Sequence, residues 1–323
     1  MDLSVVIPTH DKQALLVRTL DALGRQDPGP GVRWEVVVVD DGSTDGTGER
    51  LRSLTGTFPV PLTVVTPPEN VGRARARNLG ARAARGRFLV FLDDDIMAPP
   101  GLLAAHLQLV RGRADLGTIG FAVTDPDLID APHFHYLDTR GAARLPAGAA
   151  PARYFVTQNA GVPREAFLGI GGFDEEFSAY GFEDMELAFR LEDLAGVRFR
   201  ALTRPVPVHI HHHSLEEYLA KKIECGAHTL PRLAGLHPGR IREMRLGAVL
   251  DPPGGEPGPG TRLLRALLDG PLPGWATRLV AGWPTRGNRR PAAFSLYCRA
   301  MGFVILGCYR KGFRDHSGHG NMA

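Results

Sequence analysis

Short apolar runs alternate with amphipathic stretches over the first hundred residues. Four of these runs are predicted to be strands of one sheet: residues 3–8, 35–39, 62–65 and 88–92. After the first run, Leu16, Leu20 and Leu23 recur at helical spacing, and Asp11 is expected to cap that helix. Asp45 is expected to cap the next one. Strands that alternate with helices predict right-handed crossovers and an α/β fold with a mostly parallel, Rossmann-like sheet flanked by helices.

Further elements are predicted beyond residue 100. Strands are expected at 118–123, 154–157 and 198–208, the last at a sheet edge because two prolines interrupt it. Helices are expected at 183–195, from Ser214 onward, at 261–269 and at 293–309. The predicted organisation is an α/β domain over 1–215 and a mainly helical C-terminal extension over 216–323. Within the extension, the Pro/Gly-rich stretch at 251–260 has the composition of a long loop.

The overall charge narrows the classes of partner. The 323 residues are 43% hydrophobic and 23% charged, as in folded proteins, and the formal net charge is only +3. This balance implies no general field that would attract polyanions. The arginine-rich stretch after Gly72 also lacks the interleaved aromatic residues of a nucleic-acid surface. We therefore expect anion binding to be local and no nucleic-acid partner.

The cysteines and the N-terminal sequence indicate a reducing compartment. The three cysteines lie late in the chain without CxxC spacing, which argues against a disulfide framework or a zinc ribbon. The sequence MDLSVVIPTH lacks the basic region and long apolar core of a signal peptide, and the apolar stretch at 300–309 is about half as long as a membrane span. We therefore expect a cytoplasmic protein.

Carboxylates follow two of the predicted strands. Asp40 and Asp41 close the second strand, and Asp93, Asp94 and Asp95 close the fourth. Because the carboxyl ends of parallel strands lie at one edge of a sheet, these side chains are expected to meet in one crevice. Carboxylates at i and i+2 on a rigid strand can bind a hard cation such as Mn²⁺ or Mg²⁺ and leave sites for diphosphate oxygens. The alternative is a solvated acidic turn, which a position directly after an apolar strand disfavours.

Two later stretches add candidate chemistry. Glu183 and Asp184 stand at the start of a predicted helix, where a carboxylate can face an acceptor hydroxyl or simply complement the helix dipole. In the histidine run at 209–213, alternate side chains share one side of an extended chain, and one of them could complete a metal shell. A zinc site made only of histidines is also compatible with the spacing, but no other soft ligands accompany it.

These blocks together resemble the family-2 glycosyltransferases with the nucleotide-diphosphosugar transferase (GT-A) fold. The matching sequences are VVIPTHDKQALLVRTLDAL, VVVVDDGSTDGT, ENVGRARARNLGARAARGRFLVFLDDD, GGFDEEFSAYGFEDMELAFRL and VHIHHHS, which cover roughly the first two thirds of the chain. The resemblance implies metal-dependent transfer of a sugar from a nucleotide-diphosphosugar, with a UDP-sugar favoured, to an acceptor hydroxyl with inversion. The acceptor would be a glycan, a lipid-linked molecule or a small molecule.

The resemblance also implies roles for individual residues. Asp184 would be the catalytic base, and Glu183 would hold acceptor hydroxyls. The metal ligands would come from a second set: Asp93, Asp95 and either His209 or His211. A third set would contact the nucleotide sugar: Pro8, Thr9, Asp40, Asp41, Asn70, Gly72, Arg77, Asn78, Asp93 and Asp94.

Other classes fit the sequence less well. A nucleotidyltransferase needs a glycine-rich phosphate loop after the first strand, where this chain reads PTHDKQALL. A degenerate transferase that only binds a nucleotide sugar or a partner is disfavoured by the presence of Asp93, Asp95 and Asp184. A retaining transferase of the same fold would carry similar acidic loops, so it stays an alternative.

Basic residues flank the apolar stretch 301–306 near the C-terminus: Arg299, Arg310, Lys311 and Arg314. A basic amphipathic helix there would suit a lipid-linked acceptor and peripheral contact with the inner face of a membrane. A core helix packed on the transferase domain is the more common role for such a stretch.

Overall fold

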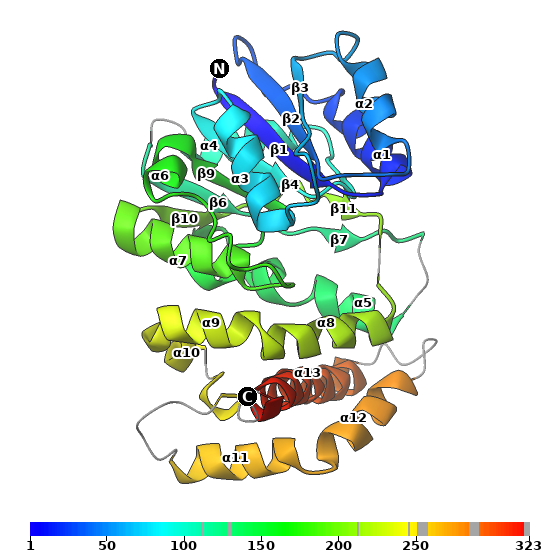
Figure 1. Ribbon diagram of the computed structural model, residues 1–323, viewed down its shortest axis with the longest axis vertical. Coiled ribbons are helices and arrows are strands. Elements are labelled where there is room, and N and C mark those ends of the chain that lie inside the picture. Colours follow the sequence, from blue (N-terminus) through cyan, green and yellow to red (C-terminus); the bar gives the residue numbers. More distant parts are fainter. Residues whose placement is uncertain are drawn as a thin grey trace. The chain divides into compact units, whose positions relative to one another are not determined.

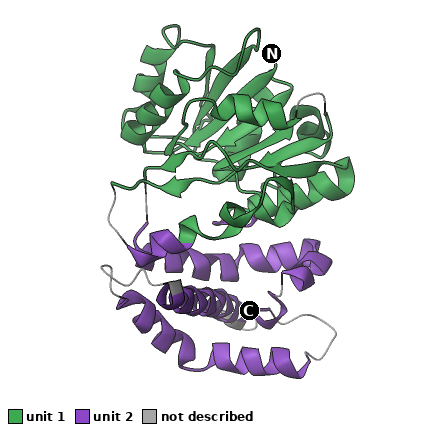
Figure 2. Ribbon diagram, turned by 180° about the vertical axis from the view of Figure 1, so that it is seen from behind, with its two compact units in different colours: residues 1–128, 137–178, 183–212 green, residues 129–136, 179–182, 213–323 purple. Residues whose placement is uncertain are grey.

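The computed structural model describes residues 1–110, 113–127, 131–211, 213–244, 246–250, 258–283 and 291–319. The chain divides into two compact units, which Figure 2 colours separately. Unit 1 comprises 1–128, 137–178 and 183–212, and unit 2 comprises 129–136, 179–182 and 213–323. The start of the last segment of unit 2 lies close to the predicted boundary at 215. Of the predicted loop at 251–260, residues 251–257 lie outside the described part.

Unit 1 contains a sheet of eight strands among the described residues, in the order β3-β2-β1-β4-β9-β6-β10-β8 (Figure 1). Its strands are β1 (Leu3–Thr9), β2 (Trp34–Asp40), β3 (Leu62–Val65), β4 (Phe88–Leu92), β6 (Leu116–Ile119), β8 (Gly148–Ala150), β9 (Asn159–Pro163) and β10 (Arg198–Ala201). β1 to β4 are parallel, whereas β9 and β8 run antiparallel to their neighbours. The mostly parallel sheet of the prediction is therefore confirmed.

A smaller sheet carries one of the candidate histidines. It is formed by β5 (Ile96–Met97), β11 (Val208–His209) and β7 (Val123–Thr124), in the order β5-β11-β7. β11 runs antiparallel to β5, with His209 opposite Ile96, and the Ile210 amide donates to the carbonyl of Asp95. This register brings His209 next to the acidic triplet, although the two lie far apart in the sequence.

Helices cover both faces of the large sheet (Figure 1). On one face, α1 (Gln13–Leu23), α2 (Thr47–Leu54) and α4 (Leu102–Val110) bury leucines against Val5 and Ile7 of β1. On the other face, α3 (Arg73–Ala83) packs where Gly80 allows close approach, since a Cβ atom there would lie 2.5 Å from Val6. α6 (Arg164–Gly169) and α7 (Glu183–Ala195) lie on the same face as α3. The segments that connect the strands contain α5 (Pro132–Asp138) and the 3₁₀ turns η1 (Gly141–Arg144) and η2 (Ala152–Tyr154).

Three predicted strands differ from the structure. The stretch 154–157 is not a strand, because 152–154 forms a 3₁₀ turn and the returning strand is β9. The run at 118–123 is divided between β6 and β7, and the run at 198–208 between β10 and β11. β10 is not an edge strand, since it pairs with β6 on one side and β8 on the other.

The cap predicted for α1 also needs correction. Asp11 does not cap that helix, because its carboxylate accepts hydrogen bonds from the backbone and hydroxyl of Thr44. Asp45 instead accepts from the backbone amides of Gln13 and Thr47, the first residues of α1 and α2. One carboxylate thus satisfies an unpaired amide at the start of two helices.

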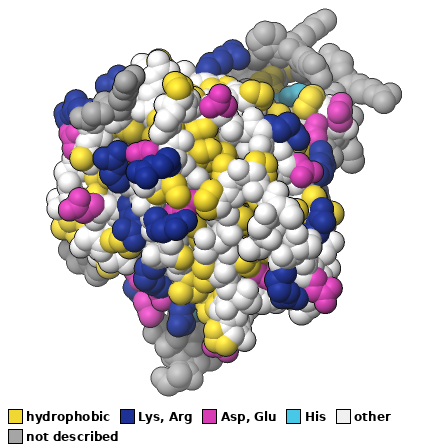
Figure 3. Space-filling model, turned by 90° about the horizontal axis from the view of Figure 1, so that it is seen from above, with side chains coloured by type: hydrophobic (Ala, Val, Ile, Leu, Met, Phe, Trp, Pro, Cys, Tyr) yellow, Lys and Arg dark blue, Asp and Glu magenta, His cyan; other side chains and the backbone are white. Residues whose placement is uncertain are grey.

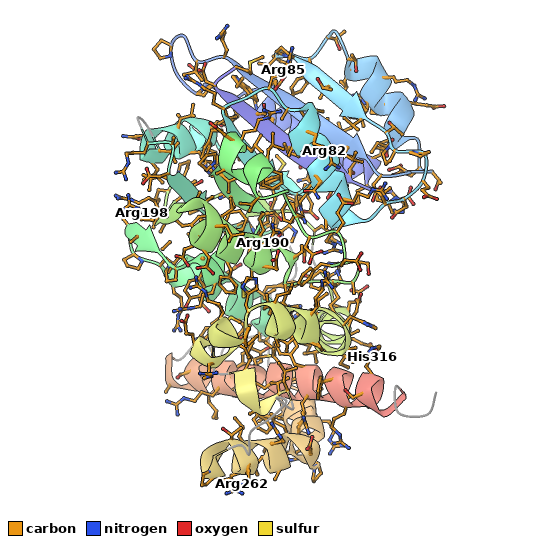
Figure 4. The ribbon with its side chains drawn as sticks, turned by 60° about the vertical axis from the view of Figure 1, so that its left-hand side comes forward. Arg82, Arg85, Arg190, Arg198, Arg262 and His316 are labelled. Atoms are coloured by element: carbon orange, nitrogen blue, oxygen red, sulfur yellow. The ribbon has the colours of Figure 1, made fainter. Side chains whose placement is uncertain are left out.

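The arginines of α3 and the turn after it form ion pairs on the surface of unit 1. Arg75 and Arg82 each lie 3.6 Å from a carboxylate oxygen of Glu175. Arg85 binds the buried carboxylate of Glu35 at 2.6 Å, and Figure 4 labels both Arg82 and Arg85. On the face drawn in Figure 3, basic side chains gather in small groups with acidic side chains beside most of them.

Unit 2 is helical in its described part. It contains α8 (Leu215–Ala227), α9 (Thr229–Leu236), α10 (Pro238–Glu243), η3 (Leu246–Ala248), α11 (Pro259–Asp269), α12 (Leu272–Ala281) and α13 (Pro291–His319). Ser214 caps α8 through a reciprocal pair of hydrogen bonds with Glu217, as the predicted helix start requires. The core joins Leu219 of α8 and Val280 of α12 to Met301 and Val304 of α13.

The helix α13 is apolar over an unusual length. Within the described residues, Ala292–Ser317 is long and apolar enough to cross a membrane by length and composition. However, Tyr297, Met301 and Val304 are buried in the core of unit 2, and Arg310 is buried in an ion pair with Asp269 at 2.8 Å. In this structure α13 therefore packs one side into the core of unit 2, and 28% of its apolar stretch is buried.

Candidate active site

The acidic triplet lies at the carboxyl end of β4, where the side chains of its three members have different surroundings. Asp93 is 33% exposed, whereas Asp94 and Asp95 are buried. The Thr9 hydroxyl at the end of β1 donates to Asp94 Oδ2 at 2.8 Å. Lys12 Nζ bridges the two buried members, at 3.0 Å from Asp94 Oδ1 and 2.8 Å from Asp95 Oδ2. The sequence pattern did not indicate Lys12, yet it is the cation nearest to this pair among those whose contacts are described.

Burial and ion pairing shift the two buried carboxyls in opposite directions. Burial raises the pKa of Asp94 to about 6, although Lys12 opposes the shift. Burial acts on Asp95 in the same sense, but His209 and Lys12 outweigh it and hold the pKa of Asp95 well below its usual range. Burial by itself would lower the pKa of Lys12, but the attraction of both aspartates outweighs it and raises that pKa. The ammonium of Lys12 therefore provides a permanent positive charge next to the acidic triplet.

Arg77 joins the triplet to the second acidic block. Arg77 is 5% exposed, and its guanidinium lies 2.9 Å from Asp93 Oδ1 and 3.4 Å from Glu183 Oε1. Asp184 Oδ1 is 3.8 Å from the same guanidinium. α3 supplies Arg77, β4 leads into Asp93, and α7 begins at Glu183, so three separate elements meet here. The acidic triplet and the start of α7 therefore meet in unit 1, whereas Asp40 and Asp41, which were predicted to meet the triplet, have no contact with it among those described.

The pKa of the Asp184 carboxyl lies near neutrality. Burial and then the charge of Glu183 raise its pKa to about 7, against the opposing charge of Arg77. Thr157 orients the carboxylate, with its amide at 3.1 Å and its hydroxyl at 2.9 Å. Glu183 Oε2 is buried and accepts no hydrogen bond from the described residues. One oriented carboxyl and one unsatisfied acceptor therefore stand side by side at the start of α7.

Asp95 and His209 fit a divalent metal. Asp95 Oδ1 is buried and accepts no hydrogen bond of good geometry from the described residues, although His209 Nε2 lies 3.0 Å away. A carboxylate oxygen beside an imidazole nitrogen suits Mn²⁺, which accepts both ligand types. Asp93 Oδ1 is engaged by Arg77, and the described residues hold no group of three His, Cys, Asp or Glu side chains arranged for a metal. The ion-pair contact favours His209, while His211, partly buried beyond β11, stays an alternative ligand.

The end of β2 organises the loop before α3. Asp41 accepts from the amides of Val71 at 2.7 Å and Gly72 at 3.0 Å, and Asn70 donates to the Asp41 carbonyl. Asp40 is buried and accepts from the Ser43 amide. The Asp41 carboxylate therefore holds the N-terminus of α3 in place, and its predicted contact with the nucleotide sugar stays a prediction.

Two other residues that were predicted to contact the nucleotide sugar, Pro8 and Asn78, have different surroundings. Pro8 is partly exposed in β1, directly before Thr9. Asn78 is buried, and its amide bonds to both backbone groups of Phe173 and to the Glu175 carboxylate. These contacts make Asn78 a residue that positions the 173–175 loop, with no contact to the acidic cluster among those described.

The sheet and helices of unit 1 have the GT-A fold. The sequence model of glycosyl transferase family 2 matches residues 4–168, and that of the N-terminal domain of galactosyltransferase matches residues 147–213. The chain therefore belongs to glycosyltransferase family 2, as its sequence motifs predicted.

Curated relatives are named as glycosyltransferases. Validoxylamine A glucosyltransferase of Streptomyces hygroscopicus subsp. limoneus is 37% identical over 224 residues, which cover 58% of this chain and 47% of the relative. An uncharacterized glycosyltransferase of Bacillus subtilis is 30% identical over 265 residues, covering 66% of both chains. The chain spans about half the length of the two validoxylamine A glucosyltransferases that it matches.

Solved structures of transferases share the fold. A mannosyltransferase from Pyrobaculum calidifontis in complex with GDP-Man and Mn²⁺ aligns with a TM-score of 0.61 and 25% identity, over 97% of this chain and 86% of its own. Residues 1–349 of TarS from S. aureus in complex with UDP align with a TM-score of 0.54 and 18% identity, over 99% of this chain and 92% of its own. The second comparison supports the fold alone.

Proposed function

We propose that this chain transfers a sugar from a nucleotide-diphosphosugar to an acceptor hydroxyl, with inversion at the anomeric carbon. A UDP-sugar is the donor favoured by the sequence resemblance, and a glycan, a lipid-linked molecule or a small molecule is the acceptor class. The observation that carries the proposal is the Arg77 bridge, which unites Asp93 with Glu183 and Asp184 in one cluster at the carboxyl edge of the sheet.

Asp184 has the properties of the general base. An inverting transfer requires removal of the acceptor proton while the hydroxyl oxygen attacks the anomeric carbon and the nucleoside diphosphate leaves from the opposite side. Thr157 fixes the orientation of Asp184, and a pKa of about 7 lets its carboxylate take up a proton at neutral pH and release it afterwards. The unsatisfied Glu183 Oε2 would accept a hydrogen bond from the acceptor.

Asp95 and His209 would hold the metal, with Asp93 as a further ligand. A bound Mn²⁺ or Mg²⁺ supplies positive charge that stabilises the departing diphosphate. The backbone amides that Asp41 orders at 71–72 stand at the N-terminus of α3, where the helix dipole favours anions. Lys12 and Arg77 provide the remaining positive charge of the site.

A donor-binding experiment tests this function. A thermal-shift panel of UDP, GDP, ADP and their sugars, with and without Mn²⁺, should show stabilisation by one nucleoside diphosphate that Mn²⁺ increases. The same panel on Asp95→Ala should lose the Mn²⁺ effect, while Asp21→Ala, an exposed aspartate of α1, should retain it. Indifference of the wild type to every nucleotide would contradict the proposal, and binding without turnover would identify a degenerate transferase.

A product experiment tests the stereochemistry. Once a donor is found, NMR of the product anomeric centre should show the configuration opposite to that of the donor. Retention of configuration would contradict the inverting mechanism and the role of Asp184 as base, while leaving the donor site intact.

A further inference from the structure

Two consecutive helices of unit 2 expose large apolar side chains on their outer side. On α11, Leu263 is 64% and Leu267 is 38% exposed, at i and i+4. On α12, three further side chains repeat the spacing at i, i+3 and i+7: Leu272 (42%), Trp275 (58%) and Leu279 (37%). We call these five residues the α11–α12 surface.

The inner sides of the same helices are already occupied. Ala276 and Val280 of α12 are buried with Met301 of α13, and Leu268 of α11 is buried as well. α11 and α12 contact each other and α13, and in Figures 1 and 2 they follow one another along one side of α13. The exposed leucines and Trp275 therefore cannot be covered by turning either helix, because the opposite side would lose its own burial.

An open pocket of about 950 Å³ is lined by α8, α11, α12 and α13, and its lining includes Leu219, Pro273 and Val304. Exposed apolar patches of this kind mark surfaces that are covered by a partner or by lipid.

The charge of α11 and α12 indicates which kind of partner would cover this surface. The helices α11 and α12 contain three arginines, Arg262, Arg265 and Arg278, and one acidic residue, Asp269, whose carboxylate is paired with Arg310 and Arg314. Arg262 and Arg278 are exposed on α11 and α12, and Figure 4 shows Arg262 at the outer side of α11. Amphipathic helices that bind the surface of anionic bilayers carry leucine, tryptophan and arginine in this way. The one carboxylate of α11 and α12 would not repel such a surface, because arginines neutralise it.

We propose that the α11–α12 surface docks on an anionic lipid surface and holds the protein peripherally at a membrane. The leucines and Trp275 would enter the boundary between headgroups and acyl chains, and the arginines would pair with lipid phosphates. This assigns membrane contact to α11 and α12, whereas the sequence pointed to the basic ends of α13. The proposed membrane contact can be tested separately from the transfer reaction, because binding to vesicles is measured without a sugar donor or an acceptor.

Co-sedimentation of the full chain with vesicles tests the proposal. The wild type should pellet with phosphatidylcholine vesicles that contain about a third phosphatidylglycerol, less with pure phosphatidylcholine, and less as the salt concentration rises. The double variant Leu263→Ser/Trp275→Ser should bind at least about tenfold more weakly. The matched control Leu194→Ser removes a leucine that is 70% exposed on α7 and should bind like the wild type.

A charge variant keeps the test valid if the apolar variant fails to fold. Arg262→Glu/Arg278→Glu alters only exposed side chains and should abolish the preference for anionic vesicles while far-UV circular dichroism stays unchanged. The proposal is overturned if the wild type ignores anionic vesicles, or if Leu194→Ser weakens binding as much as the double variant. It is also overturned if light scattering shows a dimer of this chain that Leu263→Ser/Trp275→Ser dissociates, since the surface would then belong to a second copy.

Discussion

The ammonium of Lys12 lies 2.8 Å from the carboxylate of Asp95, which we propose as a metal ligand. Removing this cation in Lys12→Met would leave Asp94 and Asp95 with less compensating charge. We expect a lower melting temperature in metal-free buffer and about three- to tenfold tighter Mn²⁺ binding, because a divalent cation would no longer be repelled by the lysine. Isothermal titration with Mn²⁺ measures the affinity directly.

Lys12→Arg is the matched control for that prediction. It preserves the positive charge at the start of α1, so its Mn²⁺ affinity should stay near that of the wild type. Equal Mn²⁺ affinities for Lys12→Met and the wild type would show that Lys12 and the metal do not share Asp95.

The pKa of Asp184 predicts how transfer depends on pH. Since burial raises this pKa to about 7, the carboxyl is protonated below neutrality and cannot accept a proton there. We expect kcat/KM to rise about tenfold per pH unit below pH 7 and to level off above it. Asp184→Asn should reduce kcat by about 10²- to 10⁴-fold at every pH while leaving donor affinity unchanged. A collapse of donor affinity in Asp184→Asn would place this residue in donor binding instead.

Arg77 is expected to dominate the stability of the acidic cluster. Arg77→Met would leave the carboxylates of Glu183 and Asp184, together with the partly exposed carboxylate of Asp93, without their shared cation, at a cost of about 3–5 kcal/mol in the free energy of unfolding. Protonation would relieve the repulsion, so the deficit should be smaller at about pH 5 than at about pH 8. Urea denaturation at both pH values, with Arg75→Met on the exposed side of α3 as control, measures the difference. A deficit that is independent of pH would indicate lost packing rather than lost charge.

A substitution in the loop before Glu183 is expected to lower turnover without changing donor binding. Tyr180 is anchored to α8 and the start of α9, because its amide donates to Glu224 and its carbonyl accepts from Cys225 and Thr229. Gly181 follows with φ +88°, and a Cβ atom there would lie 2.8 Å from the Cys225 sulfur. Gly181→Ala should therefore shift the start of α7.

We expect Gly181→Ala to lower kcat about ten- to hundredfold, with donor affinity unchanged. Gly169→Ala is the control, because a Cβ atom at that position meets nothing within 4 Å and its φ is not positive. A Gly181→Ala enzyme with normal kcat would show that the loop does not position Glu183 and Asp184.

Much of the scaffold was predictable because its signals are local. The four apolar runs of β1, β2, β3 and β4 lead into the polar residues Thr9, Asp40, Thr66 and Asp93. Their β-branched content and the polar residues after them were sufficient to locate the strands. The strands need only short stretches of sequence. The rule that parallel strands end at one edge placed Asp40, Asp41 and the triplet at one edge of the sheet, but the carboxylates that meet the triplet, Glu183 and Asp184, come from the start of α7.

Features that depend on distant partners were missed. β9 has the sequence NAGVP, which is a poor strand by propensity, and it becomes a strand because β4 and β6 pair with it on both sides. Lys12 resembles an ordinary exposed lysine at the start of a helix, and its reach to Asp94 and Asp95 depends on the crossover between β1 and β4. Arg77 was expected to contact the nucleotide sugar, but its bridge to Glu183 joins residues that no local pattern connects.

The chain visits unit 2 twice, at 129–136 and at 179–182, before it enters that unit finally at 213. A polypeptide that stopped after residue 211 would thus keep two short pieces whose packing partners had been deleted, among them Tyr136 and the anchored Tyr180. The helical extension is consequently not a cassette that can be exchanged between relatives by simple recombination. New acceptors or new surfaces would have to be acquired through point substitutions within helices that are inherited together with the catalytic sheet.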